Sequence, residues 1–249
     1  MIRSILVLLF FILFFLGFFP VVLLLYLIRC FSPDLERRIT LRIIQAFLSF
    51  ELIVSGTTVI PSGLENIPEK EAVLFVGNHR SDFDALVTYK YMKQPTGYVA
   101  KIELSRIPIM AQWMDLLECV FMDRKNVREG VKAISDAAEK VKKGISIFIF
   151  PEGTRNHNED RDIPMEFHKG SLKIVQKAEC RIVPVAIQDT EKIFEEHVPY
   201  ITAQTVKVRF CEPVDPQTLT KEQQKNLSGY IREIIADELQ KMRQEDITA

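Results

Sequence analysis

The segment AVLFVGNHRSDFDAL, residues 72–86, decides the fold class, because it passes from a strand pattern through a polar loop into a helix pattern. Residues 72–76 are all apolar, as in a strand that is buried on both faces of a sheet. The loop after them carries His79 and Asp84. In open α/β sheets, ligands collect at the carboxyl ends of the strands, so this loop is a candidate functional site.

Outward from this segment, short β-branched or aromatic runs alternate with helical patterns from Gly56 onward, which indicates a sheet covered by helices. Helical spacing of apolar residues predicts one helix within 127–141 and another within 227–242. Pro184 indicates an edge strand or a bulge. We therefore expect an α/β fold with a mixed sheet flanked by helices. The predicted strands are Thr57–Ile60, Ala72–Val76, Gly97–Ala100, Cys119–Met122, Ile145–Phe150, Ile182–Ile187 and Val206–Phe210.

The composition at the beginning of the chain indicates a different environment, because residues 5–28 contain no charged side chain. As one helix this run would be ~36 Å long at ~1.5 Å per residue, and the hydrocarbon of a bilayer is ~30 Å thick. Gly17 and Pro20 can kink the run or turn it back, so a true span and a hairpin within one leaflet both stay open. More arginines follow the run than precede it, which places the following domain in the cytoplasm.

Residues 35–54 have apolar side chains at helical spacing beside Arg37, Arg38 and Arg42. This pattern predicts an amphipathic helix at the lipid surface, and a core helix of the soluble domain is the alternative. The predicted domains are therefore a hydrophobic membrane anchor with an amphipathic helix over residues 1–55 and an α/β domain over residues 56–249.

The composition excludes several classes of protein. The chain has 249 residues, of which 47% are hydrophobic and 26% charged, unlike a disordered polyampholyte. Its 32 basic and 33 acidic side chains give a formal net charge of −1, so nucleic acid is not an expected partner. The 4 cysteines are widely scattered and form no metal-binding pair, so we expect reduced and mostly buried thiols.

His79 and Asp84 have the chemistry of a general base and its orienter. An imidazole with one nitrogen held by a carboxylate can use the other to remove a proton from an alcohol. A helix cap or a surface pair is the structural alternative for this spacing. A metal site built from His79, Asp82 and Asp84 is less favoured, because the chain has no second His/carboxylate cluster. A nucleophilic Ser81 is less favoured still, because no Gly-x-Ser-x-Gly motif is present.

A second polar loop, FPEGTR at residues 150–155, follows another predicted strand and should lie at the same edge of the sheet. Gly153 lets the backbone approach a ligand, and Thr154 offers a hydroxyl. Arg155 can bind a phosphate through two parallel hydrogen bonds. A turn with a solvated pair of Glu152 and Arg155 is the structural alternative.

Four segments read in order carry a family resemblance: NHRSDFD (78–84), VFMDR (120–124), FPEGTR (150–155) and IVPVAI (182–187). Together they resemble the motif blocks of the glycerolipid acyltransferase family, in particular its 1-acylglycerol-3-phosphate acyltransferases. KIEL (101–104) and FHKGS (167–171) are similar to further stretches of that family. The resemblance spans roughly residues 56–210. Asn156, where many relatives have Ser, is a departure that touches no proposed catalytic group.

The resemblance implies an enzyme that moves a fatty acyl group from acyl-CoA or acyl carrier protein to the sn-2 hydroxyl of lysophosphatidic acid, forming phosphatidic acid without a cofactor or a metal. His79 would be the general base and Asp84 its orienter. The expected partners are membrane lipids, lysophosphatidic acid and the acyl donor, with the catalytic domain on the cytoplasmic face of the membrane. The family pattern assigns the glycerol phosphate to Lys101, Arg124, Glu152, Gly153, Thr154 and Arg155.

Two other functions stay open. The acceptor could be another lysophospholipid or glycerol 3-phosphate, because the motifs identify the reaction better than the acceptor. A catalytically silent lipid-binding or scaffold protein would have the same fold, although the presence of His79, Asp84, Glu152 and Arg155 argues against it.

Overall fold

The computed structural model describes residues 1–248, so the last residue of the predicted domain 56–249 lies outside the described part. Its strands are β1 (Thr58–Ser62), β2 (Leu74–Gly77), β3 (Thr96–Lys101), β4 (Val120–Met122), β5 (Ser146–Ile149), β6 (Ile182–Gln188) and β7 (Thr205–Phe210). Its α-helices are α1 (Ile2–Gly17), α2 (Phe19–Phe31), α3 (Pro33–Ser55), α4 (Phe83–Tyr89), α5 (Met110–Leu116), α6 (Val127–Lys142), α7 (Lys173–Ala178), α8 (Lys221–Lys225) and α9 (Leu227–Thr248). Short 3-10 helices are η1 (Leu64–Asn66), η2 (Ile102–Arg106) and η3 (Thr190–Lys192).

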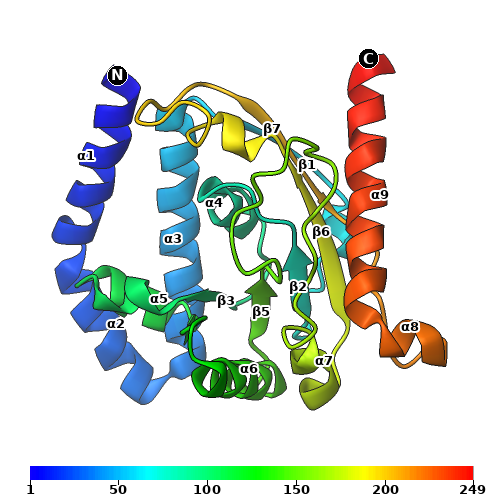
Figure 1. Cartoon of the computed structure of the whole chain (residues 1–249). Coiled ribbons are helices and arrows are strands. Elements are labelled where there is room, and N and C mark those ends of the chain that lie inside the picture. Colours follow the sequence, from blue (N-terminus) through cyan, green and yellow to red (C-terminus); the bar gives the residue numbers. More distant parts are fainter. Residues whose placement is uncertain (249) are drawn as a thin grey trace.

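One mixed sheet forms the centre of the molecule (Figure 1). Its strand order is β1-β7-β6-β2-β5-β3-β4, and every neighbouring pair is parallel except β6 and β7. Each strand coincides with a predicted run apart from small shifts at its ends, so the α/β class and the mixed sheet are confirmed. Because β6, β2, β5, β3 and β4 run in the same direction, the loops after them meet at one edge of the sheet.

The prediction that Pro184 marks an edge strand is wrong, because β6 lies inside the sheet between β7 and β2. The Pro184 carbonyl accepts a hydrogen bond from Cys211 N at 2.9 Å, one residue beyond the end of β7. The nitrogen and carbonyl of one residue point to the same side of a strand, so the proline nitrogen also faces Cys211. The missing N–H therefore affects only the last rung of the β6–β7 ladder.

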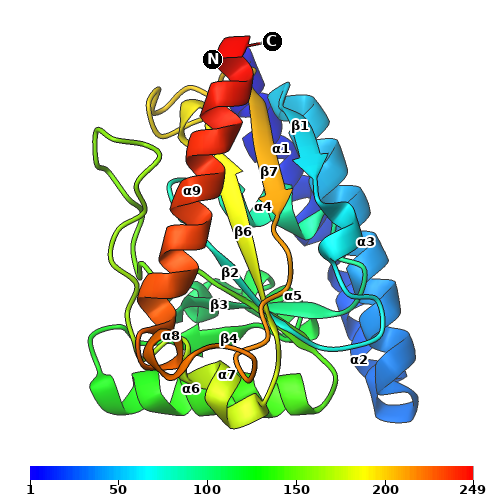
Figure 2. The same cartoon turned by 90° about the vertical axis from the view of Figure 1, so that its right-hand side faces the viewer.

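Helices cover both faces of the sheet (Figure 2). Residues along β2 alternate between the two faces, as expected for a strand that is buried on both. Phe75 belongs to a core that includes side chains of α1 to α5. Leu74 and Val76 belong to a second core that includes side chains of α6, α7 and α9. The edge of the sheet that carries the polar loops is therefore placed between two packed helical layers.

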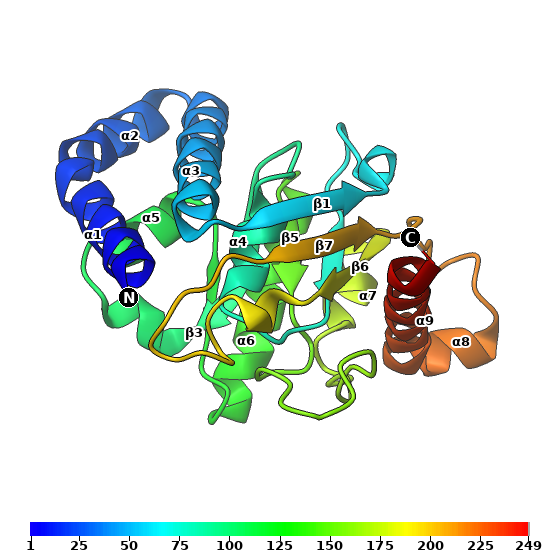
Figure 3. The same ribbon diagram turned by 90° about the horizontal axis from the view of Figure 1, so that it is seen from above.

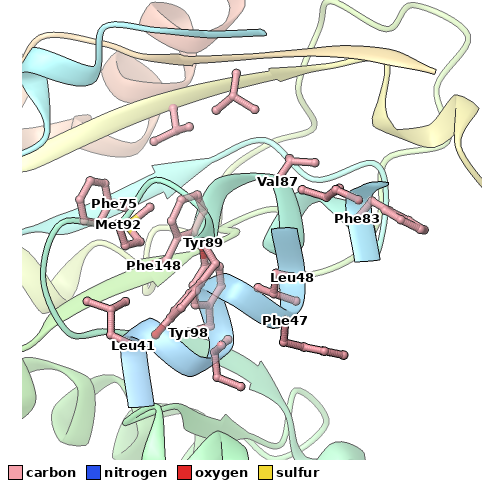
Figure 4. Packing of buried hydrophobic residues seen from close by; sticks show 14 of the residues in the cluster. Leu41, Phe47, Leu48, Phe75, Phe83, Val87, Tyr89, Met92, Tyr98 and Phe148 are labelled. Atoms are coloured by element: carbon pink, nitrogen blue, oxygen red, sulfur yellow. The ribbon is translucent and has the colours of Figure 1, made fainter. Parts of the chain in front are cut away.

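α3 packs one side against the sheet domain, as the core-helix alternative predicts. Leu41, Phe47 and Leu48 are buried in the first core, to which Val87 of α4 also belongs (Figure 4). On its outer side, Leu35 is 51% exposed and Ile53 is 72% exposed. The lipid-surface interpretation stays a prediction for that outer side.

α1 and α2 form a bent pair, with an angle of 49° between them at Phe18. Pro20 lies in the first turn of α2, where its missing N–H would have no partner within the helix. A kink is therefore present where Gly17 and Pro20 predict one. Within residues 1–248, no single helix is long and apolar enough to cross a bilayer, whereas the bent pair together meets the same test. Large apolar side chains on the pair, among them Leu8 and Leu24, are exposed.

An ion-pair network attaches the end of this helix pair to the sheet domain. Arg29 of α2 lies 2.7 Å from Asp115 of α5 and 3.0 Å from the buried Glu36 of α3. Arg37 of α3 lies 2.8 Å from Glu118, just before β4. Arg29 and Arg37 contribute to the positive charge that follows the apolar run, but acidic side chains of the same chain balance both of them.

The beginning of the helix pair is also held by the domain. The backbone N–H of Ile201, in the β6–β7 connection, donates to Ser4 Oγ at 2.8 Å. Seen from above, α1 and α2 lie beside α3 and α5 (Figure 3). Both ends of the apolar helix pair therefore contact the domain that carries the sheet.

The cysteines are free thiols and differ in their burial. Cys180 and Cys211 are buried, Cys119 is half-buried, and Cys30 is exposed. Burial raises the pKa of the Cys119 and Cys180 thiols to about 11, so both stay protonated at neutral pH.

Candidate active site

His79 and Asp84 come together in the connection between β2 and α4. His79 follows the end of β2, and Asp84 lies in the first turn of α4. The distance between His79 Nδ1 and Asp84 Oδ2 is 2.9 Å. The Asp84 side chain is 1% exposed and the His79 side chain 14%, so the carboxylate is sealed from solvent while the imidazole keeps an open side.

Several donors fix the Asp84 carboxylate. Its Oδ2 also accepts the backbone N–H groups of Arg80 at 2.7 Å and Ser81 at 2.9 Å. Its Oδ1 accepts the hydroxyl of Thr190, in the 3-10 helix η3 after β6. An ionised carboxylate can only accept, so the proton of this contact lies on His79 Nδ1 and Nε2 carries a lone pair. The arrangement gives His79 the form that a general base requires.

Glu152 supports the backbone of the catalytic loop. Its Oε1 accepts the backbone N–H of His79 at 2.7 Å, and its Oε2 accepts the backbone N–H of Met165 at 2.8 Å. Burial raises the pKa of Glu152 to about 7. Arg232 of α9 donates to the carbonyl of Met165 at 3.0 Å, so the C-terminal helix holds the other end of this connection. Glu152, predicted to bind substrate, thus contacts the loop of the base in this structure.

The His79 loop has further attachments to its neighbours. Asn78 Nδ2 donates to the carbonyl of Ile187 in β6, and Asn78 Oδ1 accepts the N–H of Ile187, both at 2.8 Å. The backbone N–H of Asn156 donates to the carbonyl of His79 at 2.7 Å. These contacts orient the imidazole before any substrate is present, which reduces the cost of reaching a reactive geometry.

Gly153 occupies a position that favours glycine. Its φ of +72° lies in the left-handed region, and a Cβ there would lie 2.9 Å from His168 Nε2. Its carbonyl accepts a hydrogen bond from the Arg124 guanidinium, which comes from the end of β4. Arg124 and Gly153, two of the predicted substrate-binding residues, are therefore adjacent.

Arg155 is paired with acidic side chains instead of pointing freely into the site. Its Nη1 lies 2.8 Å from Asp82 Oδ2 and 3.2 Å from Glu195 Oε1. Glu195 also accepts the Ser81 hydroxyl at 2.7 Å and the backbone N–H of Asp82 at 2.9 Å. A phosphate that binds Arg155 must therefore compete with these carboxylates.

The two remaining predicted residues are exposed. Lys101 ends β3, and Thr154 follows Gly153 in the loop after β5. Within residues 1–248, the structure gives neither side chain a hydrogen bond or an ion pair to the other predicted residues. Both lie at the same edge of the sheet as His79, where they are accessible to a ligand.

Sequence reasoning missed Thr190 and Glu195. Both follow β6 and lie outside the four motif segments, more than a hundred residues from the loop that they contact. Their positions depend on β6 being the neighbour of β2, so no local pattern could have identified them.

The alternative chemistries are not supported by local contacts. The Ser81 hydroxyl donates to Glu195 and accepts the backbone N–H of Phe83 at 2.9 Å, and within residues 1–248 the structure gives it no hydrogen bond to His79. In the part of the chain that the structure describes, no group of three or more His, Cys, Asp or Glu side chains is arranged to hold a metal.

A pocket of about 720 Å³ opens beside these loops. Arg124, Phe150, Gly153 and Thr154 line it together with side chains of α6 and α7. Phe150 also stacks on the imidazole of His79, with 4.3 Å between the ring centroids. Phe150 therefore belongs both to the lining of the pocket and to the surroundings of the base.

Comparison with known proteins shows the family to which the chain belongs. The family model described as Acyltransferase matches residues 58–188, which contain His79, Asp84 and all the predicted substrate-binding residues. The chain belongs to the acyltransferase family. A relative named 1-acyl-sn-glycerol-3-phosphate acyltransferase, from Borreliella burgdorferi, is 30% identical over 206 residues, which cover 83% of this chain and 81% of the relative. A relative from Mycoplasma genitalium, named as a probable 1-acyl-sn-glycerol-3-phosphate acyltransferase, is 32% identical over 219 residues, which cover 83% of this chain and 78% of the relative.

A solved structure extends the similarity of this acyltransferase to nearly the whole chain. The crystal structure of the 1-acyl-sn-glycerophosphate acyltransferase PlsC from Thermotoga maritima matches with a TM-score of 0.81 and 27% identity, covering 97% of each chain. The N-terminal helices of this acyltransferase, which precede the residues matched by the family model, are included in that match.

Proposed function

We propose that this acyltransferase transfers a fatty acyl group from an acyl thioester to the sn-2 hydroxyl of 1-acylglycerol 3-phosphate, forming phosphatidic acid. The observation that carries the proposal is the contact of His79 Nδ1 with the buried Asp84, which leaves Nε2 for the substrate. The names of the Borreliella and Thermotoga relatives support the choice of acceptor.

The reaction follows from this geometry. His79 Nε2 removes the proton of the acceptor hydroxyl while the hydroxyl oxygen attacks the carbonyl carbon of the thioester. Asp84 stabilises the imidazolium that forms. The tetrahedral intermediate collapses, the carbon–sulfur bond breaks, and the imidazolium returns its proton to the leaving thiolate. The chain's own groups carry every proton transfer, and we propose no cofactor.

The polar residues around the base bind the glycerol phosphate in this proposal. Arg124 and Lys101 supply positive charge from the ends of β4 and β3. Gly153 lets the backbone approach the ligand closely, and Thr154 supplies a hydroxyl. Arg155 contributes if the phosphate displaces it from Asp82 and Glu195, while Glu152 acts by holding the His79 backbone.

The exposed apolar surface of α1 and α2 supports a membrane location. We infer that the pair lies in one leaflet, because Ser4 at its beginning and Arg29 at its end both contact the sheet domain. A helix pair that crossed the bilayer would separate these ends. The catalytic domain would then lie on the cytoplasmic face, where acyl thioesters are available.

The test of the reaction is phosphatidic acid formation by purified wild type from lysophosphatidic acid, with acyl-CoA and acyl carrier protein offered as separate donors. His79→Ala should abolish turnover, and His197→Ala, an exposed histidine, should retain it. A panel of lysophospholipids and glycerol 3-phosphate identifies the acceptor. Wild-type turnover of another acceptor alone would refute the choice of acceptor, and ligand binding without turnover would favour the lipid-binding alternative.

The test of the membrane location is flotation with vesicles. Leu23→Asp with Leu27→Asp places two charges on the exposed apolar side and should release the protein from vesicles. Val127→Asp with Val131→Asp, exposed valines on α6, is the matched control and should float like wild type. To test the topology, Ile2→Cys in a Cys30→Ser background, which removes the exposed native thiol, should be labelled by a membrane-impermeant maleimide only from the side that also reaches the catalytic domain.

A further inference from the structure

The pocket beside the active site has an apolar floor. It lies between α6 and α7 at the ends of β3, β4 and β5, and its volume of about 720 Å³ suits a flexible organic chain. Val127 of α6 is 84% exposed and Val131 is 60% exposed, although both lie on the side of α6 that lines the pocket. A ligand in the pocket would cover part of this apolar surface. The apolar lining consists of Val99, Met122, Val127, Val131, Ile134 and Ile149.

The rim of the same pocket is positively charged. Lys169 and Lys173 line it, and within residues 1–248 the structure gives neither side chain a hydrogen bond or an ion pair. Lys177 donates to Ser135 Oγ at 3.0 Å. The acidic residues of the lining are Asp123 and Glu152, whose carboxylates already accept backbone N–H groups. The lining carries four basic side chains, Arg124, Lys169, Lys173 and Lys177, against these two acidic ones, so its net charge is positive and complements an anion attached to an apolar or amide-containing chain.

The residues that line the pocket come from two sets of segments. Arg124, Gly153 and Thr154, to which the glycerol phosphate is assigned above, come from the loops after β4 and β5, whereas Lys169, Lys173 and Lys177 come from α7 and the segment before it. α6 and α7 cover the face of the sheet that is opposite to α1, α2 and α3. An acceptor with a fatty chain reaches the site from the bilayer, along the side of the apolar helix pair. A water-soluble acyl thioester must reach the same base from the aqueous side, and the pocket opens between the helices of that side.

We propose that the pocket between α6 and α7 binds the 4′-phosphopantetheine arm of the acyl donor. Lys169 and Lys173 hold its phosphate, and the apolar floor takes the pantetheine chain. The thioester is then directed to Phe150, which lines the pocket and stacks on His79. This inference rests on the proposed function. The arm is common to acyl-CoA and acyl carrier protein, so the pocket serves either donor.

The test compares donors that differ only in the phosphate. The double variant Lys169→Ala with Lys173→Ala should raise the KM of acyl-4′-phosphopantetheine about tenfold or more, because two charge-assisted contacts are lost. The KM of acyl-pantetheine, which lacks the phosphate, and the KM of lysophosphatidic acid should change less than about twofold. Lys142→Ala with Lys143→Ala, at the far end of α6, is the matched control and should behave like wild type. Acyl-CoA and acyl carrier protein are the two further arms, and the KM of each should rise in the double variant because both carry the same phosphate.

A second variant tests the apolar floor. Val131→Phe fills the pocket from an exposed position and should raise the KM of every donor, including acyl-pantetheine. An increase in the KM of lysophosphatidic acid alone would overturn the proposal, because the pocket would then belong to the acceptor. Unchanged donor KM values in both variants would overturn it as well.

A binding measurement separates this proposal from the proposed reaction. Calorimetry of free CoA with the His79→Ala protein should detect binding that the added Lys169→Ala and Lys173→Ala substitutions weaken about tenfold. If wild type forms no phosphatidic acid but this binding is present, the reaction is refuted and the pocket is supported. If turnover is present and CoA binding does not depend on these lysines, the pocket assignment is refuted.

Discussion

The imidazole of His79 lies over the ring of Phe150, with 4.3 Å between the centroids and 17° between the ring planes. Phe150 is the first residue after β5, so the second motif loop supplies a flat support for the base in the first. Asp84 holds the edge of the imidazole at 2.9 Å. The two contacts together leave the ring little freedom to rotate.

Phe150→Leu should lower kcat about tenfold, because the imidazole loses its support and samples orientations in which Nε2 points away from the hydroxyl. Leucine keeps most of the apolar volume, so the midpoint of thermal unfolding should change little. Steady-state kinetics with lysophosphatidic acid measures the effect. An unchanged kcat would show that Asp84 alone orients the ring.

Asp84→Asn should lower kcat by about a thousandfold, because an amide does not hold the Nδ1 proton in place and does not stabilise the imidazolium. Thr190→Val removes a single donor to Asp84 and keeps the side-chain shape, so its effect should be about tenfold or less. Circular dichroism establishes that both variants are folded. Equal losses in the two variants would contradict the separate roles of the carboxylate and its donor.

Glu195→Gln should lower kcat several-fold and the free energy of unfolding by about 1–2 kcal/mol, because three contacts of the Ser81–Asp82 turn and Arg155 depend on the carboxylate. The same turn presents the backbone N–H groups that hold Asp84. Glu196→Gln, at the neighbouring exposed position, is the matched control. Similar kinetics for the two variants would contradict a positioning role for Glu195.

Glu51→Met should stabilise the protein above pH 7. Glu51 of α3 is 1% exposed, neither carboxylate oxygen has a partner among the described residues, and burial raises its pKa to about 7. Between the unfolded pKa near 4.5 and the folded pKa near 7, unfolding releases a proton, so wild type loses stability as pH rises through this range. Methionine removes the cost of burying the charge, which is on the order of 3 kcal/mol.

Denaturant titrations of wild type and Glu51→Met at pH 8 and pH 5 measure this effect. The difference in free energy of unfolding should be largest at pH 8 and should shrink at pH 5. Glu65→Met, on the half-exposed 3-10 helix η1, is the control and should show no such pH dependence. A constant difference at both pH values would mean that Glu51 does not titrate in this range.

The strands and the first half of the site could be predicted because both are encoded locally. Runs of β-branched and aromatic residues mark each strand, and His79 and Asp84 lie within one loop. The strand order could not be predicted, because β6 pairs with β2 across more than a hundred residues. The position of Pro184 in the sheet was predicted wrongly for the same reason. The sheet tolerates a proline at this position of β6 because β7 ends next to it, and the end of β7 is a property of the assembled sheet.

The second half of the site depends on those distant pairings. Thr190 and Glu195 enter the site only because η3 and the segment after it follow β6. The pairing of Arg155 with Asp82 and Glu195 also depends on three separate segments. A motif identifies which side chains have the right chemistry, whereas their partners are determined by the assembled sheet.

The contacts of Ser4 with Ile201 and of Arg29 with Asp115 give the apolar helix pair two attachment points on a rigid body. With the pair in one leaflet, as proposed above, these two contacts would hold His79 at a fixed height above the lipid. An acceptor molecule whose glycerol lies at that depth would then meet the base without leaving its leaflet. Lengthening or shortening α1 by one turn would shift that depth by about 5 Å, and the enzyme would lose its alignment with the headgroup layer before it lost its fold.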